Sequence, residues 1–195
     1  PRKRFYRVSR QLIERVREGD WNPDSFAKDR EQQDALAARG YWQAFQEVTN
    51  SVRAVLQNEN PGQVADNEHG DWYRELFGAS VAAGIIKAAD LAGYRSDRVF
   101  IRNSMHTPLA PRALPDAMSV FFELLSEETH PAVRVVLGHF IFVYIHPYMD
   151  GNGRMGRFLM NLMLASGGYP WTVVPVERRR DYMAALEQAS VHENI

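Results

Sequence analysis

Hydrophobic positions recur at helical spacing along most of the first half of the chain, which predicts amphipathic helices. The pattern runs through residues 5–18, 26–57 and 70–92. Gly40 lies inside the second of these segments, and we expect an interruption there because glycine weakens a helix. These segments predict a helical N-terminal region over residues 1–93.

The second half of the chain contains more strongly apolar helical segments. One begins at Pro131, and proline is favoured in the first turn of a helix. This segment is apolar nearly all round, so we expect it at the centre of the domain. It should end at His146-Pro147, because a residue before proline disfavours the helical region. A further buried helix is expected over residues 158–164, and an amphipathic helix that contains Tyr182 follows.

One stretch favours a strand rather than a helix. Val99-Phe100-Ile101 is rich in β-forming residues, and short polar stretches on both sides suit a small hairpin. We therefore predict an all-α fold with one small β-hairpin. Residues 94–195 would form its functional core, in one compact unit with the region before it.

Composition excludes several classes of protein. Apolar residues make up 45% and charged residues 24% of the 195 residues, which is typical of a globular domain. The net charge of −1 gives no global signal for nucleic acid or an anionic membrane. No window reaches the ~18 apolar residues of a membrane span, and the basic start leads into no apolar signal segment.

Cysteine is absent, which excludes disulfides, thiolate metal sites and cysteine nucleophiles. Its absence also favours an intracellular protein, and we expect a cytoplasmic one. The chain begins at Pro1 rather than at a methionine. We interpret it as a fragment of a longer protein.

Two apolar segments flank a short run with unusual chemistry, which begins at His146 and ends at Arg157. Within it, Gly151-Asn152-Gly153 can form a turn whose N–H groups bind an anion, and the following helix N-terminus adds its positive dipole. Arg154 and Arg157 are three residues apart, so both can reach one phosphorylated ligand.

Two more side chains complete this candidate site. Asp150 is placed to hold Mg²⁺ between phosphates, since Mg²⁺ prefers one or two carboxylates together with phosphate oxygens. His146 can accept a proton near neutral pH. Each residue taken alone is more often structural, but their combination in one run favours a phosphate-handling site.

Other sites with related residues fit less well. The run is neither a Walker A loop nor a dinucleotide fingerprint, because the required lysine and glycine spacing are missing. A zinc hydrolase would need more histidine ligands than His139 and His146 supply.

The run His146-Pro147-Tyr148-Met149-Asp150-Gly151-Asn152-Gly153-Arg154-Met155-Gly156-Arg157 resembles the signature of Fic domains (filamentation induced by cAMP), H-P-F-x-D/E-G-N-G-R-x-x-R. Every fixed position agrees except Tyr148, where phenylalanine is usual, and its ring can still pack in the core. The resemblance extends more loosely from about Tyr94 to Ile195. It implies the all-α Fic core, with the motif on a loop between two central helices and a β-hairpin flap over the site.

The resemblance also implies an activity. Most Fic domains with this motif transfer AMP from ATP to a Ser, Thr or Tyr hydroxyl of a target protein and release pyrophosphate. His146 would be the catalytic base and Asp150 the Mg²⁺ ligand. The anion nest and the phosphate clamps would be supplied by Gly151, Asn152, Gly153, Arg154 and Arg157.

Further positions follow from the resemblance alone. The flap would be residues 99–104, which would pair with a segment of the target protein by strand addition. The positions expected to lie close to the nucleotide are Ile101, Arg102, Asn103 and Ser104 in the flap, Asn161 after the motif, and Tyr182 and Ser190 on the last helix.

Many Fic proteins are inhibited by a helix with the pattern S/T-x-x-x-E-G/N. The candidate glutamates are Glu18, Glu59 and Glu193, and none has Ser or Thr four residues earlier. We therefore expect the inhibitory helix upstream of Pro1 or in trans. A homodimer is left open.

Three alternatives remain at this stage. The same fold could transfer another phosphate-containing group or remove AMP. The domain could instead be a non-catalytic module that binds a nucleotide or a partner, although such a module should have lost His146 or an arginine. DNA binding would need a domain beyond Ile195, because Arg178-Arg179-Arg180 fits the solvated first turn of a helix better than a recognition helix.

Overall fold

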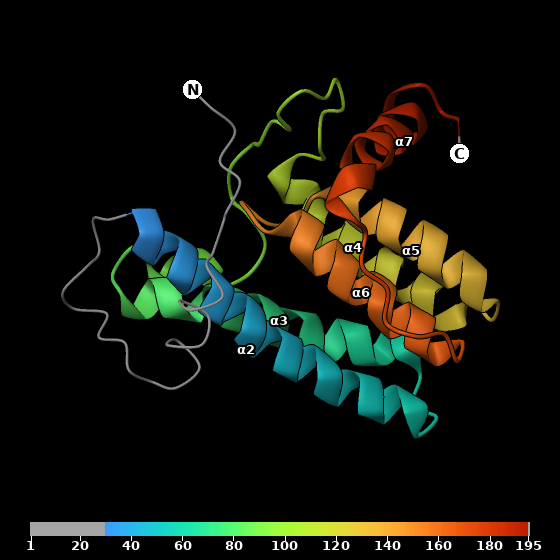
Figure 1. Cartoon of the computed structure of the whole chain (residues 1–195). Helices are drawn as coiled ribbons and strands as arrows, with labels where there is room; N and C mark the ends of the chain where they lie inside the picture. The colour runs from blue at the N-terminus through green and yellow to red at the C-terminus, as the bar shows by residue number, and fades with distance from the viewer. Residues whose placement is uncertain (1–29, 195) are drawn as a thin grey trace. The chain divides into compact units, whose positions relative to one another are not determined.

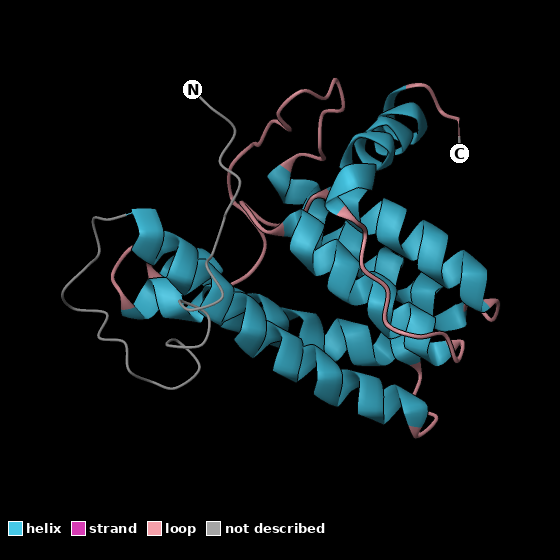
Figure 2. Cartoon of the chain, in the orientation of Figure 1, coloured by secondary structure: helices cyan, strands magenta, loops and turns pink. Residues whose placement is uncertain are grey.

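The computed structural model describes residues 30–194 (Figure 1). These residues form helices joined by loops, and no strand occurs among them (Figure 2). They divide into two compact units, one made of residues 30–49 and 69–92 and the other of residues 50–68 and 93–194. The predicted all-α class is therefore confirmed. The helix expected over residues 5–18 lies outside the described residues.

The first unit contains parts of the two longest helices, α2 (Arg30–Leu56) and α3 (Pro61–Ala82). The predicted interruption near Gly40 is wrong, because α2 runs through it. Gly40 instead marks a close approach of the two helices. A Cβ atom built on Gly40 would lie 2.2 Å from the carbonyl oxygen of Leu76, a distance that no side chain tolerates.

Helix α3 begins nine residues earlier than the predicted start at residue 70. Asn60 explains this start, because its side-chain oxygen accepts hydrogen bonds from the N–H groups of Gly62 at 2.9 Å and Gln63 at 3.2 Å. An asparagine at this position satisfies N–H groups that lack a partner inside the helix. Proline in the first turn adds to the signal. After α3 the chain makes the short 3₁₀ helix η2 (Ala88–Leu91).

The second unit is built on α4 (Leu114–Glu127), which follows the 3₁₀ turn η3 (Pro111–Ala113), and on α5 (Pro131–Ile145) and α6 (Asn152–Ser166). Helix α5 packs against both α4 and α6. The core side chains of these three helices include Met118, Phe121, Phe122, Leu125, Phe142, Met155, Phe158, Leu159 and Leu162. Each such burial stabilises the fold by roughly 1.5–3 kcal/mol.

Helix α6 is more deeply buried than α5, which differs from the prediction. Eight of the 15 residues of α6 are buried, against four of the 15 in α5. On α5, Val136 is 59% exposed and Tyr144 36% exposed. An apolar composition alone did not separate a central helix from one that keeps an apolar face open.

The chain then returns through an extended linker and η4 (Val176–Arg178) to the last helix, α7 (Arg179–Val191). Asn161 of α6 fixes this linker. Its side-chain nitrogen donates to the carbonyl oxygen of Thr172 at 3.0 Å, and its oxygen accepts from the N–H of Thr172 at 2.7 Å.

Residues 94–110 form a loop in which the predicted β-hairpin is not present. In the described part of the chain, Val99-Phe100-Ile101 has no neighbouring strand with which to form ladder hydrogen bonds, and Phe100 is 83% exposed. Beyond it the chain makes a tight turn, with Asn103 at a φ of 60° and the N–H of Ser104 donating to the carbonyl of Ile101 at 3.2 Å. A β-prone sequence without a pairing partner therefore stays a loop here.

Candidate functional site

The candidate site lies where α5 ends and α6 begins. The predicted helix end at His146-Pro147 is confirmed, since α5 ends at Ile145 and His146 is its C-cap. His146 has a φ of 55° and a ψ of 59°, the left-handed conformation. The proline that follows disfavours the right-handed helical region at His146. Such a conformation is strained for a residue other than glycine and is more frequent at functional sites.

The imidazole of His146 is held in one orientation and stays neutral. Its Nδ1 atom lies 3.2 Å from the carbonyl oxygen of Val143. Because a carbonyl only accepts, Nδ1 carries the proton and Nε2 is the basic nitrogen. Burial lowers the pKa of His146 below its ordinary value of 6.5. The positive charge of Arg95 and the neighbouring His106 lower this pKa further, while the bond to Val143 and the charge of Asp150 oppose the shift.

Asn152 holds the motif loop from inside. Its side-chain oxygen accepts from the N–H of Tyr148 at 2.9 Å, and its side-chain nitrogen donates to the carbonyl oxygen of Tyr148 at 2.7 Å. Asn152 and Tyr148 are both 2% exposed. The ring of Tyr148 lies against Tyr94 and Phe142, so the prediction that this ring packs in the core is confirmed.

The turn before α6 leaves a helix N-terminus available for an anion. Gly151 is the N-cap of α6 with a φ of 82°, a conformation that favours glycine. No side chain caps this N-terminus. The first N–H groups of a helix have no acceptor within it, so those of Asn152 and Gly153 can bind an anion.

Asp150 directly precedes Gly151 in this turn. One of its oxygens accepts from the N–H of Gly151 at 2.6 Å, and the other lies 3.3 Å from an Nη atom of Arg154. The side chain of Asp150 is 76% exposed, so its carboxylate has room for a further ligand.

The two motif arginines both extend toward the first turn of α6. Arg154 is held at Asp150 by the ion pair described above, with its own side chain 23% exposed. A Cβ atom built on Gly153 would lie 3.5 Å from Nη1 of Arg157, so this guanidinium folds back over the helix start. Arg157 also interacts electrostatically with the hydroxyl of Tyr182 on α7, and its positive charge opposes the rise that burial causes in the pKa of Tyr182.

The remaining predicted nucleotide residues fall into different places. Tyr182 is brought to the motif through Arg157. Ser190 lies two turns further along α7 and is partly buried. Asn161 is 3% exposed, and its amide is already bonded to Thr172 and to the carbonyl oxygen of Arg157. The structure therefore places Asn161 in a bridge between α6 and the linker, not at the ligand.

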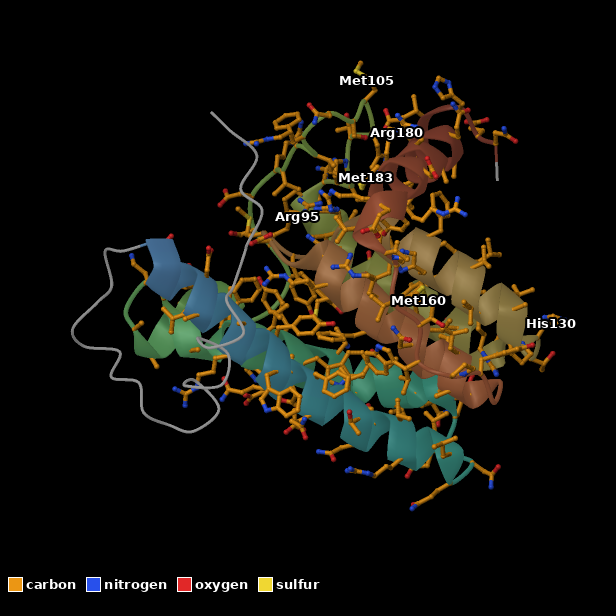
Figure 3. The ribbon with its side chains drawn as sticks, in the orientation of Figure 1. Arg95, Met105, His130, Met160, Arg180 and Met183 are labelled. Carbon is orange, nitrogen blue, oxygen red and sulfur yellow. The ribbon has the colours of Figure 1, made fainter. Side chains whose placement is uncertain are left out.

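The flap residues are tied to the last helix. Glu187 of α7 accepts hydrogen bonds from the hydroxyl of Ser104 at 2.5 Å and from the N–H of Met105 at 2.8 Å. Arg102 and Asn103 are exposed, and Ile101 is partly buried. Met105 lies at the tip of the loop in Figure 3 and is 81% exposed.

Sequence reasoning missed Arg95, which braces the loop and the motif together. Its side chain is only 4% exposed and donates to three carbonyl oxygens, those of His146 at 2.8 Å, Asp97 at 2.9 Å and Leu109 at 2.6 Å. Its own N–H donates to the carbonyl of Pro147 at 2.9 Å. Figure 3 shows Arg95 where the loop meets the helices. An arginine in a polar stretch carries no sequence signal for burial, so this role could be seen only in the structure.

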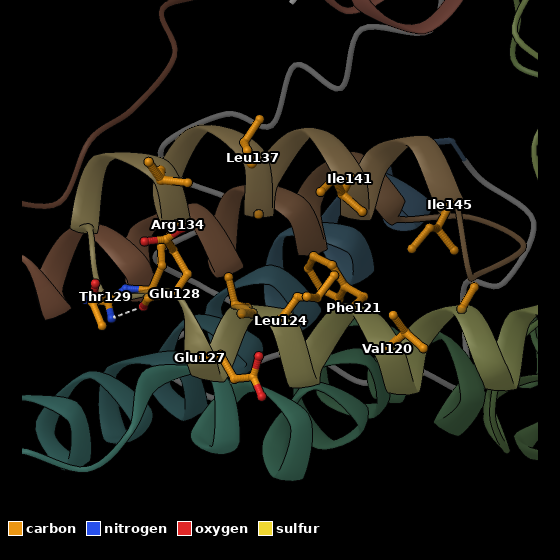
Figure 4. Close-up of a pocket in the computed structure, with 14 residues that line it drawn as sticks. Val120, Phe121, Leu124, Glu127, Glu128, Thr129, Arg134, Leu137, Ile141 and Ile145 are labelled. Carbon is orange, nitrogen blue, oxygen red and sulfur yellow. Dashed lines mark hydrogen bonds between the residues drawn. The ribbon is translucent and has the colours of Figure 1, made fainter.

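A separate apolar groove lies between α4 and α5 (Figure 4). Its volume is about 510 Å³, and its lining includes Val120, Leu124, Leu137 and Ile141. No residue of the motif lines it. A triphosphate needs cations and N–H donors, so this groove does not suit one.

Comparisons with known proteins agree with this geometry. Residues 68–164 match the model of the Fic/DOC family. The chain is 43% identical over 101 residues to the protein adenylyltransferase Fic of Nematostella vectensis, and 32% identical over 101 residues to the protein adenylyltransferase fic-1 of Caenorhabditis elegans. Each match covers 50% of this chain, but only 23% and 20% of the respective relatives.

Solved structures confirm the fold. The structure of Fic-1 (residues 134–508) from C. elegans matches with a TM-score of 0.73 at 20% identity, covering 96% of this chain and 52% of that chain. A Fic domain containing signaling protein from Bacteroides thetaiotaomicron matches with a TM-score of 0.68 at 20% identity, covering 97% of this chain and 68% of that one.

Proposed function

Because residues 68–164 make this chain a member of the Fic/DOC family, we propose that it is a protein adenylyltransferase. It would transfer AMP from ATP to a hydroxyl group of a target protein and release pyrophosphate. The observation that carries this proposal is the junction of α5 and α6, where a neutral histidine adjoins an uncapped helix N-terminus and two arginines. The matched relatives, of which this chain spans about a quarter or less, are named for the same activity.

His146 would act as the general base. Its Nε2 atom takes the proton of the target hydroxyl while the hydroxyl oxygen attacks the α-phosphorus of ATP. A new phosphorus–oxygen bond forms, and the bond from the α-phosphorus to the bridging oxygen of pyrophosphate breaks. The hydrogen bond from Nδ1 to Val143 keeps the imidazole in the tautomer that this step needs.

The negative charge on the departing pyrophosphate would be stabilised by positively charged groups and N–H donors that are already in position. Arg154 and Arg157 point toward the first turn of α6, beside the N–H groups of Asn152 and Gly153. Guanidinium groups and helix N-termini fixed before the reaction stabilise developing charge without reorganising. Phosphoryl and nucleotidyl transfer depend mainly on such positioning.

The donor set at Asp150 fits Mg²⁺ that is shared with a nucleotide. Asp150 offers one exposed carboxylate, and the residues 30–194 contain no group of three or more acidic, histidine or cysteine side chains that could hold a metal alone. Mg²⁺ commonly takes one or two carboxylates and completes its six oxygen ligands with phosphates and water. When bound, it would neutralise charge on the phosphates.

The target protein would dock on the loop at residues 99–104. Val99-Phe100-Ile101 has no strand partner among residues 30–194, and an added strand could pair with its backbone groups. Phe100, which is 83% exposed, would contribute apolar area. Inhibition by a helix upstream of Pro1 or in trans is part of the same proposal. Glu18 lies outside the described residues.

Labelled ATP tests this proposal. The purified chain would be incubated with Mg²⁺ and a cell extract, once with ATP labelled at the α-phosphate and once with ATP labelled at the γ-phosphate. We expect protein to be labelled only from the α-position. Label from the γ-position alone would instead indicate transfer of a phosphoryl group.

A further inference from the structure

A buried histidine outside the motif connects three helices at the site. His139 of α5 is 7% exposed. Its Nδ1 atom lies 2.8 Å from the carbonyl oxygen of Gly156 on α6, and its Nε2 atom lies 2.9 Å from the hydroxyl oxygen of Tyr182 on α7. Both ring nitrogens are therefore used, and neither contacts the motif base, His146.

The direction of each hydrogen bond follows from the partners. The carbonyl of Gly156 only accepts, so Nδ1 of His139 carries the proton. Burial and the charge of Arg157 lower the pKa of His139, which keeps the ring neutral and leaves Nε2 as an acceptor. Tyr182 must then donate its hydroxyl proton to Nε2. Burial raises the pKa of Tyr182, so that proton is retained.

The hydroxyl oxygen of Tyr182 still has lone pairs, and the positively charged guanidinium of Arg157 interacts with this hydroxyl. The result is a connected set of interactions, in which Arg157 interacts with the hydroxyl of Tyr182, Tyr182 donates to His139, and His139 donates to Gly156. Buried hydrogen bonds linked in this way polarise and strengthen one another. The hydroxyl proton of Tyr182 is thus committed to His139 and is not offered to a ligand.

The absence of a side chain at Gly156 permits the contact between His139 and the backbone of α6. A Cβ atom at this position would lie 2.9 Å from Cγ2 of Val143 and 3.2 Å from Cε1 of His139. Any larger residue would push α5 and α6 apart at the level of the imidazole. The glycine at this variable position of the motif therefore permits the approach that lets His139 reach the backbone of α6.

We propose that His139 is a positioning residue, which acts through Tyr182 to hold the Arg157 guanidinium where it binds the terminal phosphate of the nucleotide. This inference rests on the proposed function, because it assigns Arg157 to a triphosphate. In this inference the hydroxyl of Tyr182 links His139 to Arg157. Loss of the interactions that link His139, Tyr182 and Arg157 would let the Arg157 guanidinium move away from the start of α6, although its charge would remain.

Two substitutions at His139 separate positioning from packing. In His139→Asn the side-chain nitrogen can replace Nδ1 and keep the bond to Gly156, but nothing replaces Nε2. In His139→Gln the longer side chain can place its oxygen near the position of Nε2 and accept from Tyr182. A role in packing alone would be disturbed by both variants, whereas positioning should be kept better by His139→Gln.

The test is isothermal titration of the whole chain with ATP and with ADP, each with Mg²⁺. The ratio of the two dissociation constants reports how well the terminal phosphate is held. We expect Tyr182→Phe and His139→Asn each to reduce the preference for ATP about fivefold or more, the effect of losing roughly one hydrogen bond. His139→Gln should retain most of it, and combining Tyr182→Phe with His139→Asn should add little.

Tyr169→Phe is the matched control, since Tyr169 is 53% exposed and lies after α6, away from the motif. It should leave the ratio unchanged. An unchanged ratio in Tyr182→Phe, which removes a single hydroxyl, would overturn this inference alone. A wild-type chain that binds no ATP would overturn the proposed function and this inference with it.

Discussion

His146 combines a structural role with its proposed role as the catalytic base, and one backbone conformation serves both. Its left-handed φ of 55° ends α5 and turns the chain into the motif loop. Holding a residue in such a conformation costs on the order of 1–3 kcal/mol, so the surroundings must fix it. Arg95 does this by donating to the carbonyl oxygen of His146 itself. The proposed base is therefore positioned from its backbone as well as from its ring.

The lowered pKa of His146 predicts the pH dependence of the reaction. The imidazole of His146 faces Arg95, His106 and Asp150, and the combined effect of burial and nearby charge keeps its pKa below 6.5. The basic form should predominate at pH 7, and the acidic limb of kcat/KM should have its midpoint below pH 6.5. A pH–rate profile measures this. An acidic limb with its midpoint above pH 6.5 would contradict the assignment.

The same shift has a consequence for stability. A histidine whose folded-state pKa is lowered stabilises the fold above its unfolded-state pKa, and this contribution is lost as the pH falls through the folded-state value. His139 and His146 both shift in this direction. Their protonation therefore opposes the folded state below pH 6.5.

Asn152 offers a stability prediction at the residue scale. Asn152→Ala removes both partners of the buried Tyr148 backbone groups. A buried polar group left without a partner costs about 1–3 kcal/mol, so the free energy of unfolding should fall by at least about 2 kcal/mol. Urea denaturation measures it. Asn152→Asp, which keeps the acceptor and loses the donor, should also destabilise, and wild-type stability in both variants would refute this role.

At the scale of elements, helix periodicity predicted most helices well because their apolar faces recur regularly. The prediction failed where one residue type is compatible with two different structural roles. Gly40 was interpreted as a break, whereas it allows close packing against the backbone of Leu76. Asn60 lies between the two predicted helical segments 26–57 and 70–92, whereas in the structure it caps the second helix. In both cases the deciding information is a contact or a side-chain direction.

Two glycine substitutions in helices of the same unit test the packing of α2 on α3. Gly40→Ala places a Cβ 2.2 Å from a carbonyl oxygen, while a Cβ at Gly78 meets nothing within 4 Å. Overpacking should make Gly40→Ala about 1–3 kcal/mol less stable. Gly78→Ala should be neutral or up to about 1 kcal/mol more stable, as alanine favours a helix. Thermal denaturation compares them, and similar effects of both substitutions would argue against the close approach.

At the scale of the whole molecule, the local geometry of the motif was predictable because its residues are contiguous and because glycine, proline and helix ends determine it. The link between His139, Gly156 and Tyr182 was not, since it depends on how three helices pack. Arg95 was missed for the same reason, because its three carbonyl partners lie in separate parts of the chain. The flap strand would depend on a partner for pairing.

Features outside the catalytic motif remain predictions. The chain spans 23% and 20% of the two curated relatives compared with it above, so target choice and inhibition are matters for the whole protein. Among residues 30–194, no helix has the length and apolar character needed to cross a bilayer. The cytoplasmic location and the homodimer stay expectations.

The most direct test of the central claim compares AMP transfer by the wild-type chain and by His146→Ala. Both would be given saturating ATP labelled at the α-phosphate, Mg²⁺ and the same protein substrate, after titration has shown that both bind ATP. Loss of a general base should lower the initial rate of protein labelling about 10²–10⁴-fold in the variant. Equal labelling by the two proteins, or no labelling by a wild type that binds ATP, would contradict the account.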